Sequence, residues 1–227
     1  MKSFPKNRPF IRLSYDIDEN APHFPSIDPL EKVQRTSIPK GDANNMSAVK
    51  IHAHYGTHVD APYHFNNEGP KITDFDVNHY YFKNPLTVEI PKEEGQPITQ
   101  EEIKKFEDAI KGKDLLLIRT GYSRYRENPL KYLNTPYLEV DGAQYLIGHF
   151  PGLRALGIDC VSILNPKFRP IGVEAHRTLL GYYNPEKFIL LLEDLNLNFG
   201  HKVLEEVIAL PLFIKDVEAF PCTIIAR

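Results

Sequence analysis

The sequence has no tryptophan, only two cysteines, and neither a long apolar run nor a cluster of like charges. A disulfide-stabilised scaffold usually carries more cysteines. Cys160 and Cys222 each lie in an apolar, strand-like stretch, so we expect two buried, reduced thiols. No stretch approaches the roughly 20 apolar residues that a membrane span needs, and no basic start with an apolar core indicates a signal peptide. We therefore predict a cytoplasmic protein.

Composition and charge narrow the range of partners. Of the 227 residues, 42% are hydrophobic and 25% are charged, and the formal net charge is -3. These fractions are ordinary for a globular protein. A weak and dispersed charge argues against binding to nucleic acid or to an anionic membrane surface. A small molecule is therefore the expected partner.

Apolar periodicity predicts a mixture of strands and helices. Strands are expected at residues 10–17, 47–54, 85–91, 114–121, 156–163, 188–193, 207–214 and 221–226. Helices are expected at residues 101–110, 141–150 and 174–180. The first helix would begin with a capping box of Thr99 and Glu102 and end before Gly112. With no repeat or linker, residues 1–227 are predicted to form one domain of the α/β or α+β class around one core.

Two of these strands carry more specific expectations. Residues 47–54 alternate, with Val49 and Ile51 on the apolar side, which is the period of a half-buried strand. Residues 114–121 contain an unbroken apolar run, which predicts a strand that is covered on both faces.

A short segment concentrates side chains that can bind metal ions. It holds four of the nine histidines and one aspartate: His52, His54, His58, Asp60 and His64. An extended backbone would point His58 and Asp60 to the same side, and a turn at Gly56 would bring His54 back towards them. Two imidazoles and a carboxylate suit zinc, manganese or iron as divalent ions. The carboxylate of Asp60 has two oxygens, so it could bridge two ions.

His64 has a different expected role. Pro62 would start a loop that places His64 slightly outside the ligand set. A metal ion lowers the pKa of bound water to near neutrality, and an unliganded histidine beside it can move a proton to a leaving group. The competing interpretation is a set of hydrogen-bonded loop histidines, which would desolvate four imidazoles without a ligand. His52 is expected either to support a ligand or to lie at the surface.

Residues 54–65, H-Y-G-T-H-V-D-A-P-Y-H-F, resemble the signature H-x-G-T-H-x-D-x-P-x-H-F of the cyclase family of metal-dependent hydrolases. That family includes bacterial kynurenine formamidases and isatin hydrolases. Further resemblances extend over most of the chain, at residues 72–75, 114–122, 157–162, 175–180, 191–197 and 210–212. The family fold is a single compact α/β domain around a mixed β-sheet, described as a swivelling β/β/α fold, and its members form dimers or tetramers.

The resemblance also implies roles for individual residues. Five side chains would bind one or two divalent ions: His54, His58, Asp60, His176 and Glu193. Asp60 would bridge the two ions, and His64 would be the general acid/base. Zinc is the first choice of ion and manganese the second. The resemblance implies a homodimer or homotetramer, in which a neighbouring subunit could complete the site.

The spacing between His176 and Glu193 is longer than the family pattern, and residues 181–187 look like an insertion. Glu193 is still favoured as the last ligand, because it ends an apolar strand. Glu174 and Glu186 are the alternatives.

Substrate contacts follow from a second set of departures. Phe24, followed by proline and serine, stands where the family often has a tryptophan that touches substrate, and Asn165 stands where aspartate is common. Phe24, Tyr55 and Tyr122 are expected to form an aromatic pocket.

The predicted function is that of a metal-dependent amidohydrolase of the arylformamidase type. The first substrate candidate is an aryl formamide such as N-formylkynurenine, and the alternative is a cyclic amide, imide or lactone. A non-catalytic, metal-stabilised binding protein is the alternative from another class. The intact His64 argues against it, because a structural site needs no extra proton carrier.

Overall fold

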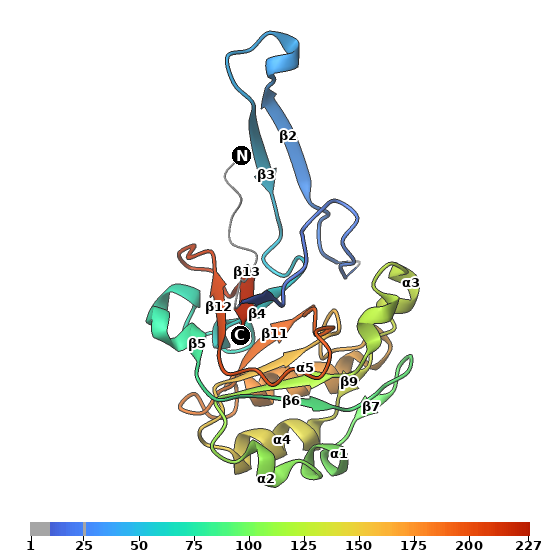
Figure 1. Cartoon of the computed structure of the whole chain (residues 1–227). Coiled ribbons are helices and arrows are strands. Elements are labelled where there is room, and N and C mark those ends of the chain that lie inside the picture. The colour runs from blue at the N-terminus through green and yellow to red at the C-terminus, as the bar shows by residue number, and fades with distance from the viewer. Residues whose placement is uncertain (1–9, 25) are drawn as a thin grey trace.

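A nine-stranded mixed sheet forms the body of the computed structural model, which describes residues 10–24 and 26–227 (Figure 1). Its strands lie in the order β5 (Tyr81–Phe82), β12 (Val207–Pro211), β13 (Ala219–Ala226), β4 (His58–Asp60), β11 (Leu190–Glu193), β10 (Ala155–Ile158), β8 (Leu115–Arg119) and β6 (Pro85–Glu89), and β1 (Ile11–Arg12) pairs with β13. Strands β6, β8, β10 and β11 are parallel to one another, whereas β4 runs antiparallel to both β11 and β13. The α/β class with a mixed sheet is therefore confirmed.

Helices connect the parallel strands and cover one face of the sheet. They are α1 (Gln100–Lys104), α2 (Glu107–Ile110), α3 (Pro129–Tyr132), α4 (Val140–His149) and α5 (Arg169–Leu179). Short 3-10 helices lie at Ile38–Lys40, Pro62–His64, Ile72–Asp74, Val77–Tyr80, Tyr122–Tyr125 and Pro166–Phe168, and a small separate sheet pairs β7 (Pro97–Ile98) with β9 (Tyr137–Leu138). None of the helices in the described part of the chain is both long and apolar enough to cross a membrane.

Most expected elements are present, with shifted boundaries. The capping box of Thr99 and Glu102 starts α1 as expected, but the predicted helix 101–110 is divided into α1 and α2 at Lys105 and Phe106. The predicted helix 174–180 begins earlier, at Arg169, because the proline that follows is tolerated in a first helical turn. The predicted strand 10–17 is reduced to Ile11–Arg12.

Strand β8 shows why the central strands are apolar throughout. Leu116 and Ile118 pack into the cluster beneath the helices, whereas Leu115 and Leu117 pack into the cluster on the opposite face. Both faces are covered, as the sequence predicted. The two cysteines belong to different clusters, Cys160 to the first and Cys222 to the second, and both are free and buried.

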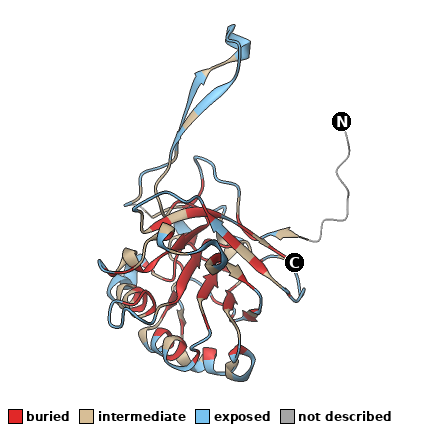
Figure 2. Cartoon of the chain, turned by 90° about the vertical axis from the view of Figure 1, so that its left-hand side faces the viewer, coloured by how far each residue is buried: buried red, intermediate tan, exposed pale blue. Residues whose placement is uncertain are grey.

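The expectation of a half-buried strand at residues 47–54 is wrong. Strands β2 (Glu31–Thr36) and β3 (Met46–Lys50) form a hairpin that projects from the body and is largely exposed (Figure 2). Val49 is 57% exposed, because the hairpin does not lie on the central sheet. The strand ends at Lys50, so the following histidines lie in a loop that leads towards β4.

Candidate metal centre

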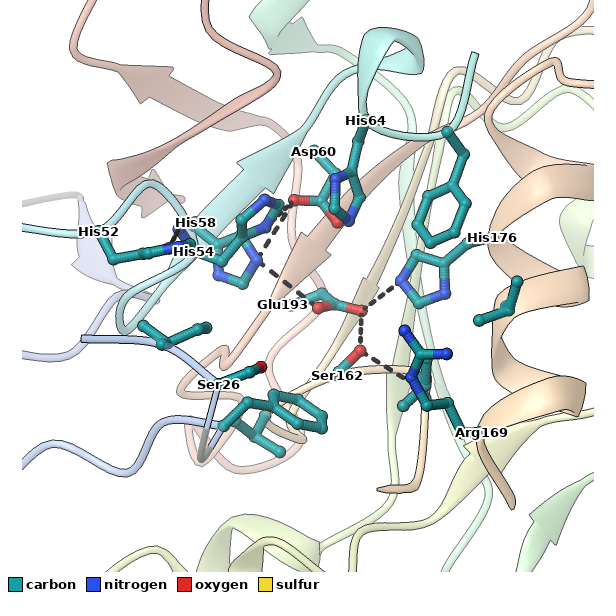
Figure 3. Close-up of a pocket in the computed structure, with 16 residues that line it drawn as sticks. Ser26, His52, His54, His58, Asp60, His64, Ser162, Arg169, His176 and Glu193 are labelled. Carbon is teal, nitrogen blue, oxygen red and sulfur yellow. Dashed lines mark hydrogen bonds and ion pairs between the residues drawn. The ribbon is translucent and has the colours of Figure 1, made fainter. Parts of the chain in front are cut away.

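Strand β4 carries two of the predicted ligands into the middle of the sheet. His58 and Asp60 lie two residues apart, so their side chains point to the same side. Gly56, with φ of 68°, makes the turn before the strand in a conformation that suits glycine. The pairing of β4 with β11 places Glu193 directly opposite His58. Two distant segments thus present their polar side chains at one point (Figure 3).

The first group of donor atoms surrounds Asp60. Its Oδ1 lies 2.9 Å from Nδ1 of His54 and 3.3 Å from Nε2 of His58. The ring of His58 is oriented by its Nδ1, which donates a hydrogen bond of 2.8 Å to the carbonyl oxygen of Gly56. This bond leaves a lone pair on Nε2 free to bind a cation, the arrangement usual for metal-binding histidines.

The second group of donor atoms surrounds Glu193. His176, on α5, donates from Nδ1 to the carbonyl oxygen of Gly172 over 2.7 Å, and its Nε2 lies 3.6 Å from Oε1 of Glu193. The same Oε1 accepts hydrogen bonds from the Ser162 hydroxyl at 2.9 Å and from the backbone N–H of Ile163 at 2.8 Å. The carboxylate of Glu193 is therefore fixed from behind, while Oε2 faces His58 at 3.6 Å.

The two groups share Asp60, and their geometry fits a divalent cation. One potential ligand atom each from His54, His58 and Asp60 lies within 4.8 Å of the others, and the same holds for Asp60, His176 and Glu193. A third such group, His54, His64 and Glu218, does not include Asp60 and is less buried. Nε2 of His58 and both carboxylate oxygens of Asp60 are buried. The imidazoles of His54 and His58 lie close to Asp60, but within the described residues none of these three atoms makes a hydrogen bond of acceptable geometry. Buried carboxylates and imidazoles in this state are stabilised by a bound cation.

The charges of the site are strongly coupled in the absence of a metal. Burial alone would raise the pKa of Asp60, but the imidazoles of His54 and His58 outweigh it and hold that pKa well below its usual value. Burial would lower the pKa of His54, whereas the carboxylates of Asp60 and Glu218 raise it to about 10. Protons on the histidines therefore balance the carboxylates that a metal ion would otherwise neutralise.

His64 lies beside this donor set, on the 3-10 helix Pro62–His64. Its ring centroid is 4.2 Å from that of His54 and 6.1 Å from that of His176. Burial is the main reason that the pKa of His64 falls to about 4, so its imidazole is neutral near pH 7. A neutral imidazole at this position can accept a proton.

A pocket of about 260 Å³ opens onto the donor set. Phe24 lines it, together with Ile27, Phe65, Val161 and Leu164. His52 also lines the pocket, and its Nδ1 accepts a hydrogen bond of 3.2 Å from the backbone N–H of the next histidine, His54.

Two aromatic residues expected in the pocket are not part of its lining. Tyr55 is fully buried, and its hydroxyl donates to the carbonyl oxygen of Asp18 at 3.0 Å. Tyr122 is also fully buried, and its hydroxyl donates to the carbonyl oxygen of Lys131 at 2.5 Å. Both rings pack in the protein body with their hydroxyl groups bonded to backbone, so the expectation is corrected for these two residues.

The departures from the family pattern leave the donor set unchanged. Residues 181–187 form a turn, after which Ile189 donates a backbone hydrogen bond to Leu179 and the chain enters β11. Glu174 instead bonds to Arg177 and Tyr183, and Glu186 is exposed, so neither alternative ligand reaches the donor set. Asn165 is buried and does not line the pocket; its side chain bonds to the backbone of residues 135 and 167.

Three polar residues of the site had not been expected. Glu218, next to β13, lies 3.2 Å from Nε2 of His54. Ser162 supports Glu193, and Arg169 lines the pocket. Ser162 belongs to a segment that matched the family pattern, which was a usable signal. Glu218 and Arg169 lie in no such match, and only the fold brings them to the site.

The Cyclase family model matches residues 11–163 of the chain, which is more than half of it. The chain belongs to this family of metal-dependent hydrolases. The predicted family and the predicted enzyme class are therefore confirmed.

Several curated kynurenine formamidases match this cyclase-family chain over nearly its whole length. A kynurenine formamidase of Geobacillus thermodenitrificans is 31% identical over 215 residues, which cover 94% of each chain. A kynurenine formamidase of Bacillus thuringiensis is 29% identical and covers 98% of this chain and 99% of the relative. Among solved structures, isatin hydrolase A from Ralstonia solanacearum has a TM-score of 0.78 at 17% identity, covering 96% of this chain and 90% of its own. This likeness establishes the shared fold.

Proposed function

We propose that the protein is an amidohydrolase that cleaves the C–N bond of an aryl formamide such as N-formylkynurenine. The names of the relatives with 28–31% identity support the reaction. The observation that carries the proposal is the juxtaposition of a buried cation-binding donor set with His64, at the base of a pocket with an apolar wall. A purely structural metal site has no need of a neutral, unliganded imidazole beside it.

The donor residues would hold two metal ions. His54, His58 and Asp60 would hold one ion, and Asp60, His176 and Glu193 would hold a second. A bound divalent ion supplies an activated water and polarises the carbonyl of the substrate. Ser162 and the Ile163 N–H orient Glu193, so its carboxylate needs no rearrangement on binding.

His64 would carry the proton that the reaction must move. Hydrolysis breaks the bond between the formyl carbon and the aryl nitrogen, adds water across it, and releases formate and an arylamine. The departing nitrogen must gain a proton, and the imidazole of His64, which lies beside His54 and His176, would take one from the attacking water and deliver it there. The apolar wall around Phe24 and Phe65 would hold the aryl ring.

A cyclic amide, imide or lactone is the second candidate substrate. Phe24 favours this candidate. The family often has a tryptophan at this position, and a phenylalanine gives the pocket a different shape. The likeness to isatin hydrolases, at 17–21% identity, concerns the fold and does not decide between the two substrates.

The test is an assay of the purified protein loaded with zinc or with manganese, against N-formylkynurenine, isatin and an aryl lactone. Chelator-sensitive hydrolysis of the formamide at a kcat/KM of about 10⁴ M⁻¹s⁻¹ or more is the expected result. Hydrolysis of isatin or the lactone with no turnover of the formamide would replace the first candidate by the second. No turnover by metal-loaded protein on any of the three would refute both.

We also propose that the protein forms a homodimer or homotetramer. The projecting hairpin of β2 and β3 exposes four large apolar side chains that a second subunit could cover: Val33, Ile38, Met46 and Val49. Light scattering on the full chain tests this, and the mass of one chain, 26.0 kDa, would contradict it. The cytoplasmic location stays a prediction from the sequence.

A further inference from the structure

Among the described residues, one lysine or arginine side chain lines the pocket beside the donor set. It is that of Arg169, the first residue of α5. The other charged or titratable lining residues all belong to the histidine and carboxylate cluster. Figure 3 shows the guanidinium of Arg169 turned into the pocket on the side of Ser162 and His176. A cation therefore stands at the edge of the space in which substrate must bind.

This guanidinium has no protein partner among residues 10–24 and 26–227. No carboxylate of these residues lies within 4.0 Å of it, and it makes no side-chain hydrogen bond with them. Arg177, on the same helix, shows the contrast, because its Nη1 binds Oε1 of Glu174 at 2.6 Å. Arg169 thus keeps the fork of N–H donors that matches a carboxylate, and it presents that fork to the pocket.

Apolar side chains also line the pocket that Arg169 and the donor set share. Phe65, Val161, Leu164 and Val173 contribute to its wall. A ligand that fits has a reacting carbonyl at the donor set, an apolar body along this wall, and an anionic group at Arg169. Burial of the apolar body supplies affinity, whereas the charged fork decides which substrates are accepted.

We propose that Arg169 binds a carboxylate of the substrate, so that the enzyme selects amides that carry an acidic group beyond the aryl ring. The inference rests on the proposed amide hydrolysis, whose substrate class it narrows. N-formylkynurenine carries such a carboxylate on its side chain, whereas isatin does not. Selection through Arg169 therefore separates the two candidate substrates by their charge.

The first test compares N-formylkynurenine with its decarboxylated analogue, which keeps the formamide and the aryl ring. Arg169→Gln is expected to lower kcat/KM for the carboxylated substrate by about 10- to 100-fold, mainly through KM, because a charge-assisted hydrogen bond is lost. The analogue should change by less than about 2-fold. Arg177→Gln is the matched control and should alter neither substrate. An equal loss on both substrates, or no loss on either, would overturn the proposal.

A binding measurement keeps the two proposals separable. Calorimetric titration of zinc-loaded protein with benzoate and with benzamide reports on Arg169 without turnover. Benzoate is expected to bind about 10-fold or more tightly than benzamide, and Arg169→Gln should remove most of that difference. If the wild-type protein hydrolyses neither formamide, the proposed reaction fails, and this titration still decides on Arg169. Benzoate affinity that is the same in Arg169→Gln and wild type, as expected if the metal alone binds it, would refute the carboxylate site.

Discussion

Glu193 stands directly opposite His58 across the ladder between β11 and β4, and the two side chains approach to 3.6 Å. Strand β4 lies antiparallel beside β11, which is parallel to its other neighbour. This pairing brings His58 next to Glu193, which is 135 positions further along the chain. The site therefore depends on strand register, since a shift by one residue would turn either side chain to the other face.

Support of Glu193 by Ser162 leads to a first prediction. Ser162→Ala removes the hydroxyl that donates to Oε1 at 2.9 Å, so the carboxylate loses one of its two fixed contacts. Zinc affinity should fall by about 10- to 100-fold, as is usual for groups that orient a metal ligand. Competition with a fluorescent chelator measures it. Ser14→Ala removes another buried hydroxyl, one that bonds to the backbone of residue 224, and should leave zinc affinity unchanged.

The role of His64 makes a second prediction. His64→Ala should retain the full metal content while turnover of the formamide falls by about 10²- to 10⁴-fold. Metal analysis and steady-state kinetics on the same sample separate the two effects. His201→Ala changes a histidine that is almost fully exposed and serves as the control. A His64→Ala variant that keeps wild-type turnover would remove His64 from the mechanism.

A third prediction concerns the residue that follows Glu193. Asp194 has φ of 53° and is held by Arg126 through two hydrogen bonds, of 3.0 and 2.8 Å. Arg126→Met would leave this buried carboxylate without a cation, bonded only to the Tyr132 hydroxyl at 2.7 Å, so the free energy of unfolding should fall by about 3–5 kcal/mol. In contrast, Arg124→Met breaks an exposed pair with Glu93 and should cost about 0–1 kcal/mol. Urea unfolding measures the free energy of unfolding of both variants. Equal losses of stability would show that the buried ion pair contributes no more than the exposed one.

The coupled histidines predict how the metal-free protein responds to pH. In the folded chain the pKa of His54 is raised from 6.5 to about 10, so its protonation stabilises the fold fully below pH 6.5. This contribution is lost as the pH rises towards about 10. His64 does not contribute in this window, because burial moves its pKa in the opposite direction, to about 4.

Thermal unfolding in the presence of a chelator tests this dependence. The Tm of the wild-type protein should decrease between pH 6.5 and pH 10, and His54→Gln should show a smaller decrease. Zinc should reverse the trend, because the ion competes with these protons and binds more tightly as pH rises. Parallel curves for the variant and the wild type would refute the assigned coupling.

The local part of the site was predictable from the sequence, whereas its remote part was not. His58 and Asp60 share a face because strand side chains alternate, and Gly56 marks the turn before them. These residues are only a few positions apart, so their spacing in the sequence predicts their relative positions directly. Glu218 lies 164 residues from His54, and only the pairing of β13 with β4 brings it near.

The errors arose where nearness in sequence was taken as nearness in space. Tyr55 sits between two candidate ligands in the signature, yet its ring turns into the protein body and its hydroxyl bonds to Asp18. The alternation around Val49 was real, but no second layer covers that hairpin within the described chain. Periodicity shows which side chains share a face, but what packs against that face is decided by the tertiary fold.

The central claim is that the shared Asp60 cluster binds divalent metal, and the most direct test is the metal content after equilibrium dialysis. Wild-type protein dialysed against zinc should retain one or two ions per chain. Asp60→Ala should retain little or none, because the two donor groups that meet at Asp60 lose their common carboxylate. Asp76→Ala, which changes an aspartate outside the donor set, is the control. Zinc content in Asp60→Ala equal to that of the wild type would contradict the account.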